Sequence, residues 1–278
     1  MDIYPEPTHC RGRAFAWGER TFIMGIVNLS PDSFSGDGLN SVESALAQAQ
    51  RFAGEGADII DVGAESTRPN SEPITVTEEI SRLMPAIEKM SGELNIPISI
   101  DSYKYDVVKQ AIKAGASIIN DIWGLKYDAR LAELAAENNL PIVVTSNQRD
   151  NPCTVDIMDE VKKDLSRAIA LCNDSGVASE NIIVDPGIGF GKTLDQNLEI
   201  IRRLAELKLF KKPILLGTSR KGMLGIVLGS PVEDRLEGTA ATNAIGIAHG
   251  ADIIRVHDVK FLSRVAKMSD AVVRRKKA

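Results

Sequence analysis

Short apolar runs rich in β-branched residues alternate along the chain with longer segments whose apolar residues recur every three or four positions. The first pattern predicts buried strands and the second predicts amphipathic helices. The predicted strands are Phe22–Val27, Asp58–Val62, Ile98–Ile100, Ala116–Ile119, Pro141–Val144, Ile182–Val184, Pro213–Leu216 and Ile253–Val256. The predicted helices are Val42–Glu55, Glu78–Ser91, Tyr103–Ala114, Ala129–Asn138, Val155–Ser175, Leu194–Leu207, Asp234–His249 and Val259–Arg275.

A strand followed by a helix, repeated in this way, predicts an α/β protein with a (β/α)8 TIM barrel. No Pro/Ser/Gly linker divides the chain, so we expect one domain over residues 1–278, with an N-terminal arm over residues 1–20. Gly56 and Gly115 follow predicted helices and are expected to be C-caps, and Thr77 is expected to start the helix that contains Glu79. His249 is expected to be a polar cap at a helix end.

A doubly wound open sheet would show the same alternation, but its ligand gathers at one switch point between two or three strands. Here nearly every predicted strand runs into polar residues at its carboxyl end, which favours the barrel. In strand order these residues are Asn28; Glu65 and Arg68; Asp101; Asn120 and Asp121; Thr145 to Asn147; Asp185; Ser219 to Lys221; and Arg255 with His257.

Asp101, Asn120 and Asp185 come from the third, fourth and sixth predicted strands. Carboxylates and amides that converge match the donors and acceptors of a planar, nitrogen-rich ring. A carboxylate can accept two hydrogen bonds at once from an amino-pyrimidine edge. The alternative is that the two aspartates cap the following helices. The three residues together favour the ligand.

A second group is cationic: Arg220, Lys221, Arg255 and His257 follow the last two predicted strands, and Asn28 follows the first. Closure of a barrel brings these strands side by side. The group is suited to two phosphates, held by arginine and by a divalent cation for which the Asn28 amide oxygen is a hard ligand. The alternative for Arg220 and Lys221 is a solvated loop charge.

Two long loops, Leu29–Ser41 and Ala64–Thr77, lie at the same predicted face and are expected to be substrate clamps. Phe34 and Arg68 are poor residues for a solvated spacer. The glycine-rich segment Asp185–Thr193 lacks the spacing of a phosphate-binding P-loop. We expect it to form a tight turn that points Phe190 into the site.

Composition excludes several other classes. A formal net charge of -5 argues against a nucleic-acid binder. The N-terminus has no apolar targeting core, and no run is long enough for a membrane span, so we expect a cytoplasmic protein with no membrane partner. Cys10, Cys153 and Cys172 have no metal-ligand spacing, which predicts ordinary thiols.

Seven segments at the strand ends carry a family resemblance. They are IMGIVNLSPDSFSGDG (Ile23–Gly38), GADIIDVGAESTRPNSEP (Gly56–Pro73), ISIDSY (Ile98–Tyr103), IINDIWG (Ile118–Gly124), DPGIGFGKT (Asp185–Thr193), GTSRKG (Gly217–Gly222) and IRVHDV (Ile254–Val259). They resemble the dihydropteroate synthase family, in which a pterin pyrophosphate is joined to para-aminobenzoate for folate biosynthesis.

The resemblance implies a role for each matching residue. Asp101, Asn120, Asp185 and Lys221 would hold the pterin; Asn28, Arg255 and His257 would bind the pyrophosphate, with Asn28 also a Mg²⁺ ligand. Ser66, Thr67, Arg68, Pro69, Phe190 and Gly222 would shape the aminobenzoate pocket, and Asp32 and Phe34 belong to the first loop. Asp101, Lys221 and Arg255 would serve catalysis: pyrophosphate leaves first, and the arylamine then attacks a cationic pterin methylene. The family is also a sulfonamide target and commonly dimeric, so a homodimer is expected.

This sequence departs from the family pattern at several places. Thr145 and Ser146 stand where Met-His is usual, so one apolar cover on the pterin face is missing. Gly222 replaces a common Ser, while its backbone N–H remains; Ser30 replaces a common Thr and Ala64 a common Gly. Two alternatives stay open. One is a methyltetrahydrofolate-corrinoid methyltransferase, which has no use for a pyrophosphate site; the other is a pterin-binding paralogue without activity.

Overall fold

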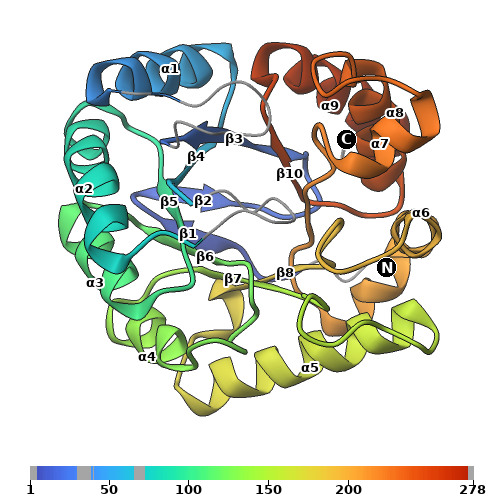
Figure 1. The fold of residues 1–278 in the computed structure, drawn as a ribbon, viewed down its shortest axis with the longest axis horizontal. Helices are drawn as coiled ribbons and strands as arrows, with labels where there is room; N and C mark the ends of the chain where they lie inside the picture. The colour runs from blue at the N-terminus through green and yellow to red at the C-terminus, as the bar shows by residue number, and fades with distance from the viewer. Residues whose placement is uncertain (1–4, 30–38, 40, 66–72, 275–278) are drawn as a thin grey trace.

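The computed structural model describes residues 5–29, 39, 41–65 and 73–274, which fold around a barrel of parallel strands (Figure 1). The strands are β3 (Phe22–Asn28), β4 (Ile59–Gly63), β5 (Ile98–Asp101), β6 (Ile118–Asp121), β7 (Ile142–Thr145), β8 (Ile182–Asp185), β9 (Leu215–Leu216) and β10 (Ile253–Val256). They pair in the order β8-β7-β6-β5-β4-β3-β10-β9. An isolated parallel bridge between Val184 and Ile214 joins the two ends. The predicted TIM barrel is confirmed.

Helices surround the strands on the outside, as Figure 1 shows. They are α1 (Val42–Glu55), α2 (Val76–Glu93), α3 (Tyr105–Ala114), α4 (Arg130–Glu137), α5 (Ile157–Asp174), α6 (Leu194–Arg202), α7 (Gly222–Leu228), α8 (Leu236–Ala248) and α9 (Val259–Val273). Gly56 and Gly115 are the predicted C-caps, with φ angles of 105° and 107°. His249 is the C-cap of α8, and its ring Nδ1 lies 2.8 Å from the Ile201 carbonyl oxygen.

Three details of the predicted helices are wrong. The hydroxyl of Thr75, two residues before Thr77, caps α2 by accepting the Glu78 N–H at 3.2 Å. Helix α6 ends at Arg202, after which Leu204–Phe210 forms 3-10 turns. Helix α7 was not predicted, because its short run GMLGIVL is too apolar and too brief to show a helical period.

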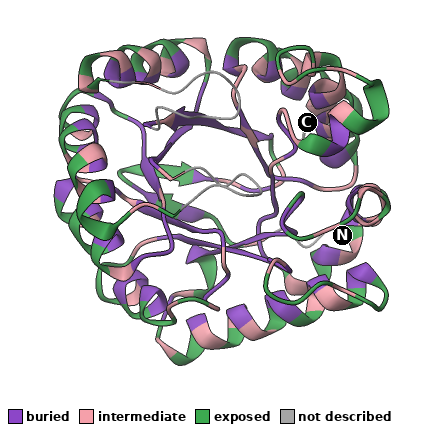
Figure 2. Cartoon of the chain, viewed as in Figure 1, coloured by how far each residue is buried: buried purple, intermediate pink, exposed green. Residues whose placement is uncertain are grey.

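Side chains alternate between two cores along each strand. Ile60, Val62 and Ile119 belong to the large core between the strands and the helices. Gly25 has no side chain there because Phe52 of α1 lies against its backbone. The opposite side chains fill the lower barrel with an apolar layer: Phe22, Met24, Ile59, Ile118, Val143, Ile183, Leu215 and Ile253. Figure 2 shows that the strands are buried almost throughout.

Residues 5–20, predicted as an N-terminal arm, contain a hairpin made of β1 (Thr8–Cys10) and β2 (Arg13–Phe15). Cys10 and Phe15 of the hairpin, together with Trp17 after it, share one apolar cluster with the lower barrel layer. The Trp17 indole N–H donates to the Thr8 hydroxyl at 3.1 Å. The hairpin therefore covers the amino-terminal end of the barrel, which leaves the carboxyl ends of the strands for a site.

Candidate active site

A polar layer lies directly above the apolar layer of the barrel. Two positions beyond that layer, β3 has the apolar Ile26, whereas the other strands lead to Asp61, Asn120, Thr145, Asp185, Gly217 and Arg255. Because side chains two apart on a strand share a face, these residues point into the barrel. Asp101 joins them through its contact with Arg255. The alternation along the strands thus brings the predicted pterin residues to one place.

Arg255 is at the centre of this layer. Its Nε donates to Asp61 Oδ2 at 2.6 Å and its Nη2 donates to Asp101 Oδ2 at 2.6 Å. Asn120 Nδ2 donates to the same Asp61 oxygen at 3.1 Å. Asp61 is fully buried, and its Oδ1 has no hydrogen-bond partner. A buried cation held by two carboxylates orients all four side chains, since each depends on the others for its partner.

Asp61 was missed at the sequence level because only residues at the predicted strand ends were considered. It lies inside β4, two residues before the end of that strand. The sequence did contain a sign of its role, because Asp61 is a lone carboxylate within the apolar run IIDVG. A buried carboxylate is rare unless it is paired.

Burial changes the protonation of the layer. It raises the pKa of Asp101 to about 7, an effect that Arg255 opposes and Asp61 reinforces. Burial also raises the pKa of Asp185, against the Gly187 N–H and Lys221, which lower it. Burial lowers the pKa of Lys221 to about 8, with Arg255 adding to this shift and Asp185 opposing it. Asp101 and Lys221 therefore titrate near neutral pH.

Lys221 enters from the loop before α7 and contacts the aromatic ring that was predicted to face the site. Its Nζ lies 4.4 Å from the centroid of the Phe190 ring. A Cβ at Gly189 would lie 3.3 Å from Lys221 Cδ, so this glycine, at φ 81°, leaves the lysine its path. Phe190 is buried in a small apolar cluster with Tyr103 and Ile122. The expected tight turn is confirmed.

Of the other predicted cations, His257 and Arg220 have partners in neighbouring loops. The Ser219 hydroxyl lies 2.9 Å from His257 Nδ1. Arg220 donates to Asp258 through Nε at 3.1 Å and Nη2 at 2.7 Å. Arg220, expected among the anion-binding cations, is therefore engaged in a two-point ion pair. Asn28 ends β3, where it pairs in register with Gly63, and a Cβ on Gly63 would contact Asp101.

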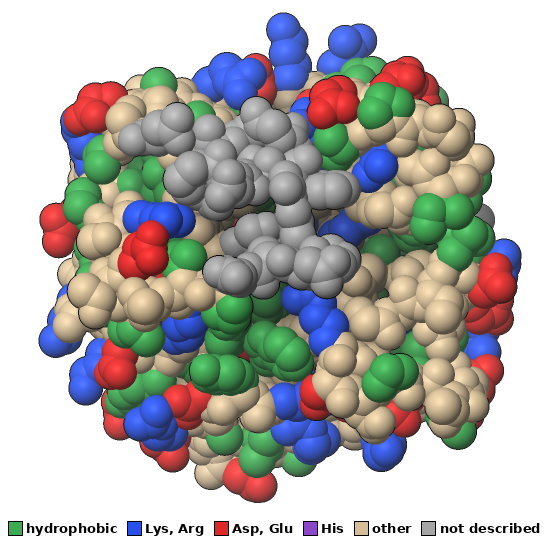
Figure 3. Space-filling view, viewed as in Figure 1, with side chains coloured by type: hydrophobic (Ala, Val, Ile, Leu, Met, Phe, Trp, Pro, Cys, Tyr) green, Lys and Arg blue, Asp and Glu red, His purple; other side chains and the backbone are tan. Residues whose placement is uncertain are grey.

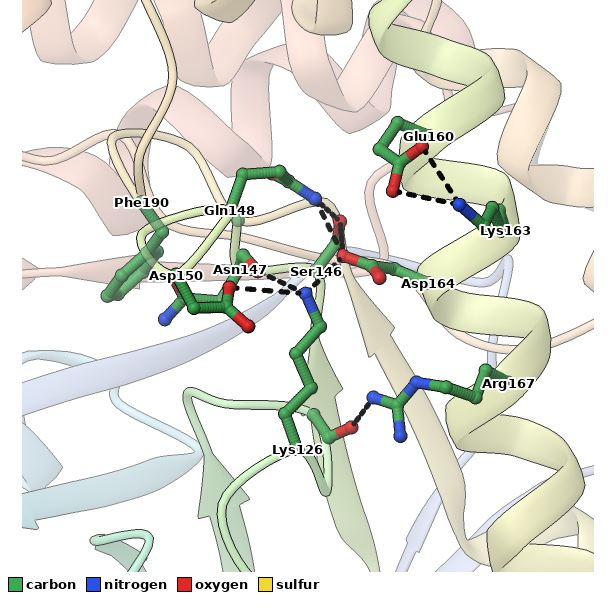
Figure 4. Close-up of polar contacts among 12 residues, drawn as sticks. Lys126, Ser146, Asn147, Gln148, Asp150, Glu160, Lys163, Asp164, Arg167 and Phe190 are labelled. Carbon is green, nitrogen blue, oxygen red and sulfur yellow. Dashed lines mark hydrogen bonds and ion pairs between the residues drawn. The ribbon is translucent and has the colours of Figure 1, made fainter. Parts of the chain in front are cut away.

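The end of β7, where the sequence departs from the family pattern, is a buried polar cluster (Figure 4). Gln148 Nε2 donates to the Ser146 hydroxyl at 2.7 Å and to Asp164 Oδ2 at 2.6 Å. Ser146 also donates to Asp164 at 3.1 Å, and Lys126 Nζ lies 3.1 Å from the same carboxylate. Thr145 is buried directly before this cluster. Polar groups therefore replace the usual Met-His pair without being left exposed.

Several predicted residues lie outside the described part of the chain: Ser30, Asp32, Phe34, Ser66, Thr67, Arg68 and Pro69. Glu65, two residues after β4, accepts hydrogen bonds from the Tyr103 hydroxyl at 2.7 Å and from Lys104 Nζ at 2.5 Å. Lys104 also donates to the Ile74 carbonyl at 2.7 Å. Gly222 is the first residue of α7, and a Cβ there would meet open space.

A cavity of about 440 Å³ opens beside the glycine-rich turn, lined by Arg149, Gly189, Gly191, Lys192 and Thr193. The Arg149 guanidinium carbon lies 4.7 Å from the Phe190 ring centroid. Figure 3 shows a face with a central hollow, where Lys and Arg side chains lie next to apolar ones. Such a mixture of cations and aromatic surface suits a flat, anionic ligand.

Comparison with known proteins identifies the family. The family model for pterin-binding enzymes matches residues 24–257. The chain is 51% identical to a dihydropteroate synthase of Clostridium beijerinckii, over 95% of this chain and 98% of the relative. This chain belongs to the dihydropteroate synthase family. The resemblance that the motifs predicted is confirmed.

Solved structures of the dihydropteroate synthase family have the same fold. One from Clostridium difficile, in the presence of pteroic acid, has a TM-score of 0.89 and 45% identity, covering 94% of this chain and 100% of that one. Another from Xanthomonas albilineans, with 4-aminobenzoic acid, has a TM-score of 0.89 and 34% identity, covering 96% and 98%. This membership favours the synthase interpretation over the corrinoid methyltransferase alternative.

Two further observations concern metal ligands and membrane-spanning helices. Among the residues that the structure describes, no three or more His, Cys, Asp or Glu side chains are grouped to hold a metal ion. Within the same residues, no helix has the length and apolar character needed to cross a membrane.

Proposed function

We propose that this chain condenses 6-hydroxymethyl-7,8-dihydropterin pyrophosphate with para-aminobenzoate, giving 7,8-dihydropteroate and pyrophosphate in folate biosynthesis. It is a transferase of the pterinylmethyl group. The observation that carries the proposal is the buried layer in which Arg255 joins Asp61 and Asp101 beside Asn120. In such a layer, acceptors for a nitrogen-rich ring would lie next to a cation for its leaving group. The family relationship supports the same reaction.

The pterin would bind to Asp101, Asn120, Asp185 and Lys221. Asp101 and Asp185 accept hydrogen bonds from ring N–H groups when ionised, and the Asn120 amide can donate and accept. Several such groups are fully or mostly buried, so a substrate that lacked the matching donors would leave them unpaired at a cost of about 1–3 kcal/mol each. This arrangement selects a pterin over a purely apolar ring.

The diphosphate would bind to Arg255, His257 and Asn28, and Mg²⁺ would bind with it. The residues present fit a Mg²⁺ ion that binds together with the diphosphate. The Asn28 amide oxygen would be its one protein ligand, and phosphate oxygens and water would supply the other ligands. Bound Mg²⁺ would neutralise charge that builds up on the leaving diphosphate. Arg255 and His257 would add positive charge at the same group.

In the reaction, the bond between the pterin methylene carbon and the diphosphate oxygen breaks, and the oxygen keeps both electrons. Asp101 would stabilise the resulting methylene cation through its negative charge. The para-aminobenzoate nitrogen then forms the new bond with its lone pair and loses one proton to solvent. No protein nucleophile is required, so Asp101, Lys221 and Arg255 act by electrostatics and binding.

Para-aminobenzoate would bind beside Phe190 and Gly222, with Ser66, Thr67, Arg68 and Pro69 completing the pocket and Asp32 and Phe34 in the first loop. The Phe190 ring already lies against Lys221, which would place the arylamine next to the pterin methylene. A sulfonamide that imitates para-aminobenzoate would compete for this pocket.

The active unit would be a homodimer. Four apolar side chains on α7 and α9 are more than half exposed: Ile226 (67%), Val227 (58%), Met268 (66%) and Val272 (72%). Exposed apolar residues in such numbers on the outer helices favour contact with a second copy. A single domain and a cytoplasmic location stay predictions.

One assay tests the reaction. The purified chain is incubated with both substrates and Mg²⁺, and dihydropteroate is quantified. If no dihydropteroate forms, the chain is instead a pterin-binding paralogue that has no synthase activity. Binding of the pterin pyrophosphate is then measured with and without Mg²⁺. We expect tighter binding with Mg²⁺, no such effect for the pterin alcohol that lacks the diphosphate, and para-aminobenzoate binding after the pyrophosphate substrate.

A further inference from the structure

The turn that presents Phe190 is held by a lysine with no role in the chemistry described above. Lys192 follows this turn, directly before the cap residue Thr193 of α6. Its side chain returns to the backbone of two loops. Nζ donates to the Gly187 carbonyl at 2.9 Å, to the Phe190 carbonyl at 3.4 Å and to the Ser146 carbonyl at 2.8 Å. One ammonium group therefore joins the turn after β8 to the loop after β7.

Close backbone packing makes this junction sensitive to the position of each loop. A Cβ on Gly187 would overlap the Ser146 carbonyl, and a Cβ on Gly191 would overlap the Gln148 backbone. The Gln148 N–H donates to the Phe190 carbonyl at 3.2 Å. The two loops thus meet without intervening side chains, and they share the Phe190 carbonyl as an acceptor.

The loop after β7 is itself fixed on its other side. Asp164 of α5 accepts from Ser146 and Gln148, and Lys126 Nζ lies 3.1 Å from it and donates to the Asn147 carbonyl at 2.5 Å (Figure 4). The Ser146 carbonyl is therefore held in place, and Lys192 links the glycine-rich turn to it. The turn contains three glycines at positive φ, which by themselves would allow it many conformations.

The outcome of this restraint is the position of the Phe190 ring. The ring is close to two cations: the Lys221 ammonium lies 4.4 Å from its centroid and the Arg149 guanidinium carbon lies 4.7 Å from it. The Phe190 carbonyl accepts hydrogen bonds from both Lys192 Nζ and the Gln148 N–H. A shift of the turn would move the ring relative to Lys221, and a displacement of about 1 Å is enough to weaken a positioned contact strongly.

We propose that Lys192 is a positioning residue for the second substrate: by tying the two loops together it sets the orientation of Phe190 and thereby the arylamine pocket. The inference rests on the proposed function, in which Phe190 borders para-aminobenzoate. Two carboxylates and two other lysines act on the charge of the Lys192 ammonium group. Burial lowers the pKa of Lys192 to about 7, Asp185 and Asp164 oppose that shift, and Lys126 and Lys221 add to it. In this proposal Lys192 acts through the Phe190 ring, although it also borders the cavity beside the glycine-rich turn.

The test is Lys192→Met, which keeps most of the length of the unbranched side chain and removes its donors. We expect KM for para-aminobenzoate to rise by about tenfold or more, because contacts of a charged donor are lost, while KM for the pterin pyrophosphate changes by less than about threefold. The matched control is Lys163→Met on α5, an exposed lysine paired with Glu160, which should leave both constants unchanged. Equal rises in both KM values, or no rise, would overturn the inference.

A double-mutant cycle with Phe190→Leu separates positioning from general loosening. If Lys192 acts through the ring, Lys192→Met should add little to KM for para-aminobenzoate once Phe190 is gone; fully additive effects would contradict the inference. Should Lys192→Met fail to fold, Lys192→Gln, which retains two donor hydrogens, replaces it in the same cycle. Failure of the wild-type chain to form dihydropteroate would instead overturn the proposed function.

Discussion

Arg255 Nη2 lies 2.6 Å from Asp101 Oδ2, so the cation proposed for the leaving group is already bound to the carboxylate proposed for the pterin. The pair holds the two side chains in place within the barrel before substrate arrives. Arg255 also donates to Asp61, so the two carboxylates share one cation. The protonation of Asp101 therefore controls both the ring-binding acceptor and the orientation of the cation.

The first prediction concerns pH. Asp101 must be ionised to accept from the pterin, and its pKa is raised to about 7, so binding weakens as the pH falls below that value. Lys221 must be protonated, and its pKa is lowered to about 8, so its charge is lost as the pH rises further. We expect kcat/KM for the pterin pyrophosphate to be bell-shaped with its maximum between these values. Lys221→Arg should move the alkaline limb upward, and a flat profile from about pH 6 to about pH 9 would contradict this.

Asp61 gives the second prediction. Its Oδ2 accepts from both Arg255 and Asn120 inside the barrel. Asp61→Asn removes a buried charge from a paired cation, so we expect the free energy of unfolding to fall by about 3–5 kcal/mol, and kcat/KM for the pterin pyrophosphate to fall with it. Chemical denaturation and steady-state kinetics measure the two effects. The exposed carboxylate Glu133 supplies the control, and Glu133→Gln should change neither quantity.

Thr145 tests the departure from the family pattern. It is buried in the polar layer where a methionine is usual. Thr145→Met should preserve or strengthen pterin pyrophosphate binding, by up to about fivefold, because the added apolar surface covers the ring. Isothermal titration gives the dissociation constant, with Thr145→Ser as a control that adds no surface. Weaker binding of the methionine variant would mean that this account of the position is wrong.

Trp17 should show the opposite behaviour, with a large effect on stability and a small one on catalysis. Its ring lies 5.7 Å from that of Phe15 and 5.2 Å from that of Phe22, at the end of the barrel away from the site. We expect Trp17→Ala to lower the free energy of unfolding by about 3–5 kcal/mol. Both KM values should stay unchanged in the folded fraction. The exposed Leu209 provides a comparison, since Leu209→Ala removes no buried contact.

The exposed apolar side chains of α7 and α9 lead to the last prediction. Ile226→Glu places a charge among those of α7, so the proposed homodimer should dissociate to monomers in sedimentation velocity. Val155→Glu, at an exposed apolar position ahead of α5, should leave the sedimentation coefficient unchanged. If the wild-type chain sediments as a monomer at all concentrations, the proposed homodimer is wrong.

The predicted elements depended on local periodicity, and most of them formed within two residues of their expected bounds. Residues such as Asp101, Asn120, Asp185 and Arg255 could be found because each lies at the last or next-to-last position of a strand, and parallel strands in a barrel end at one face. Asp61 and Lys192 could not be found in that way. Neither follows a strand end, and what each does depends on partners that no local pattern specifies.

Sequence alone determined which faces of the strands and helices are apolar, because that follows from the spacing of side chains along each element. The tertiary structure decided which polar groups meet. Arg255 and Asp61 are 194 residues apart in the chain, and they pair because barrel closure puts β10 beside β3 and β3 beside β4. Closure likewise seats the N-terminal hairpin under the apolar layer and brings Lys192 to the loop after β7. Contacts of this kind are set by the geometry of the whole barrel.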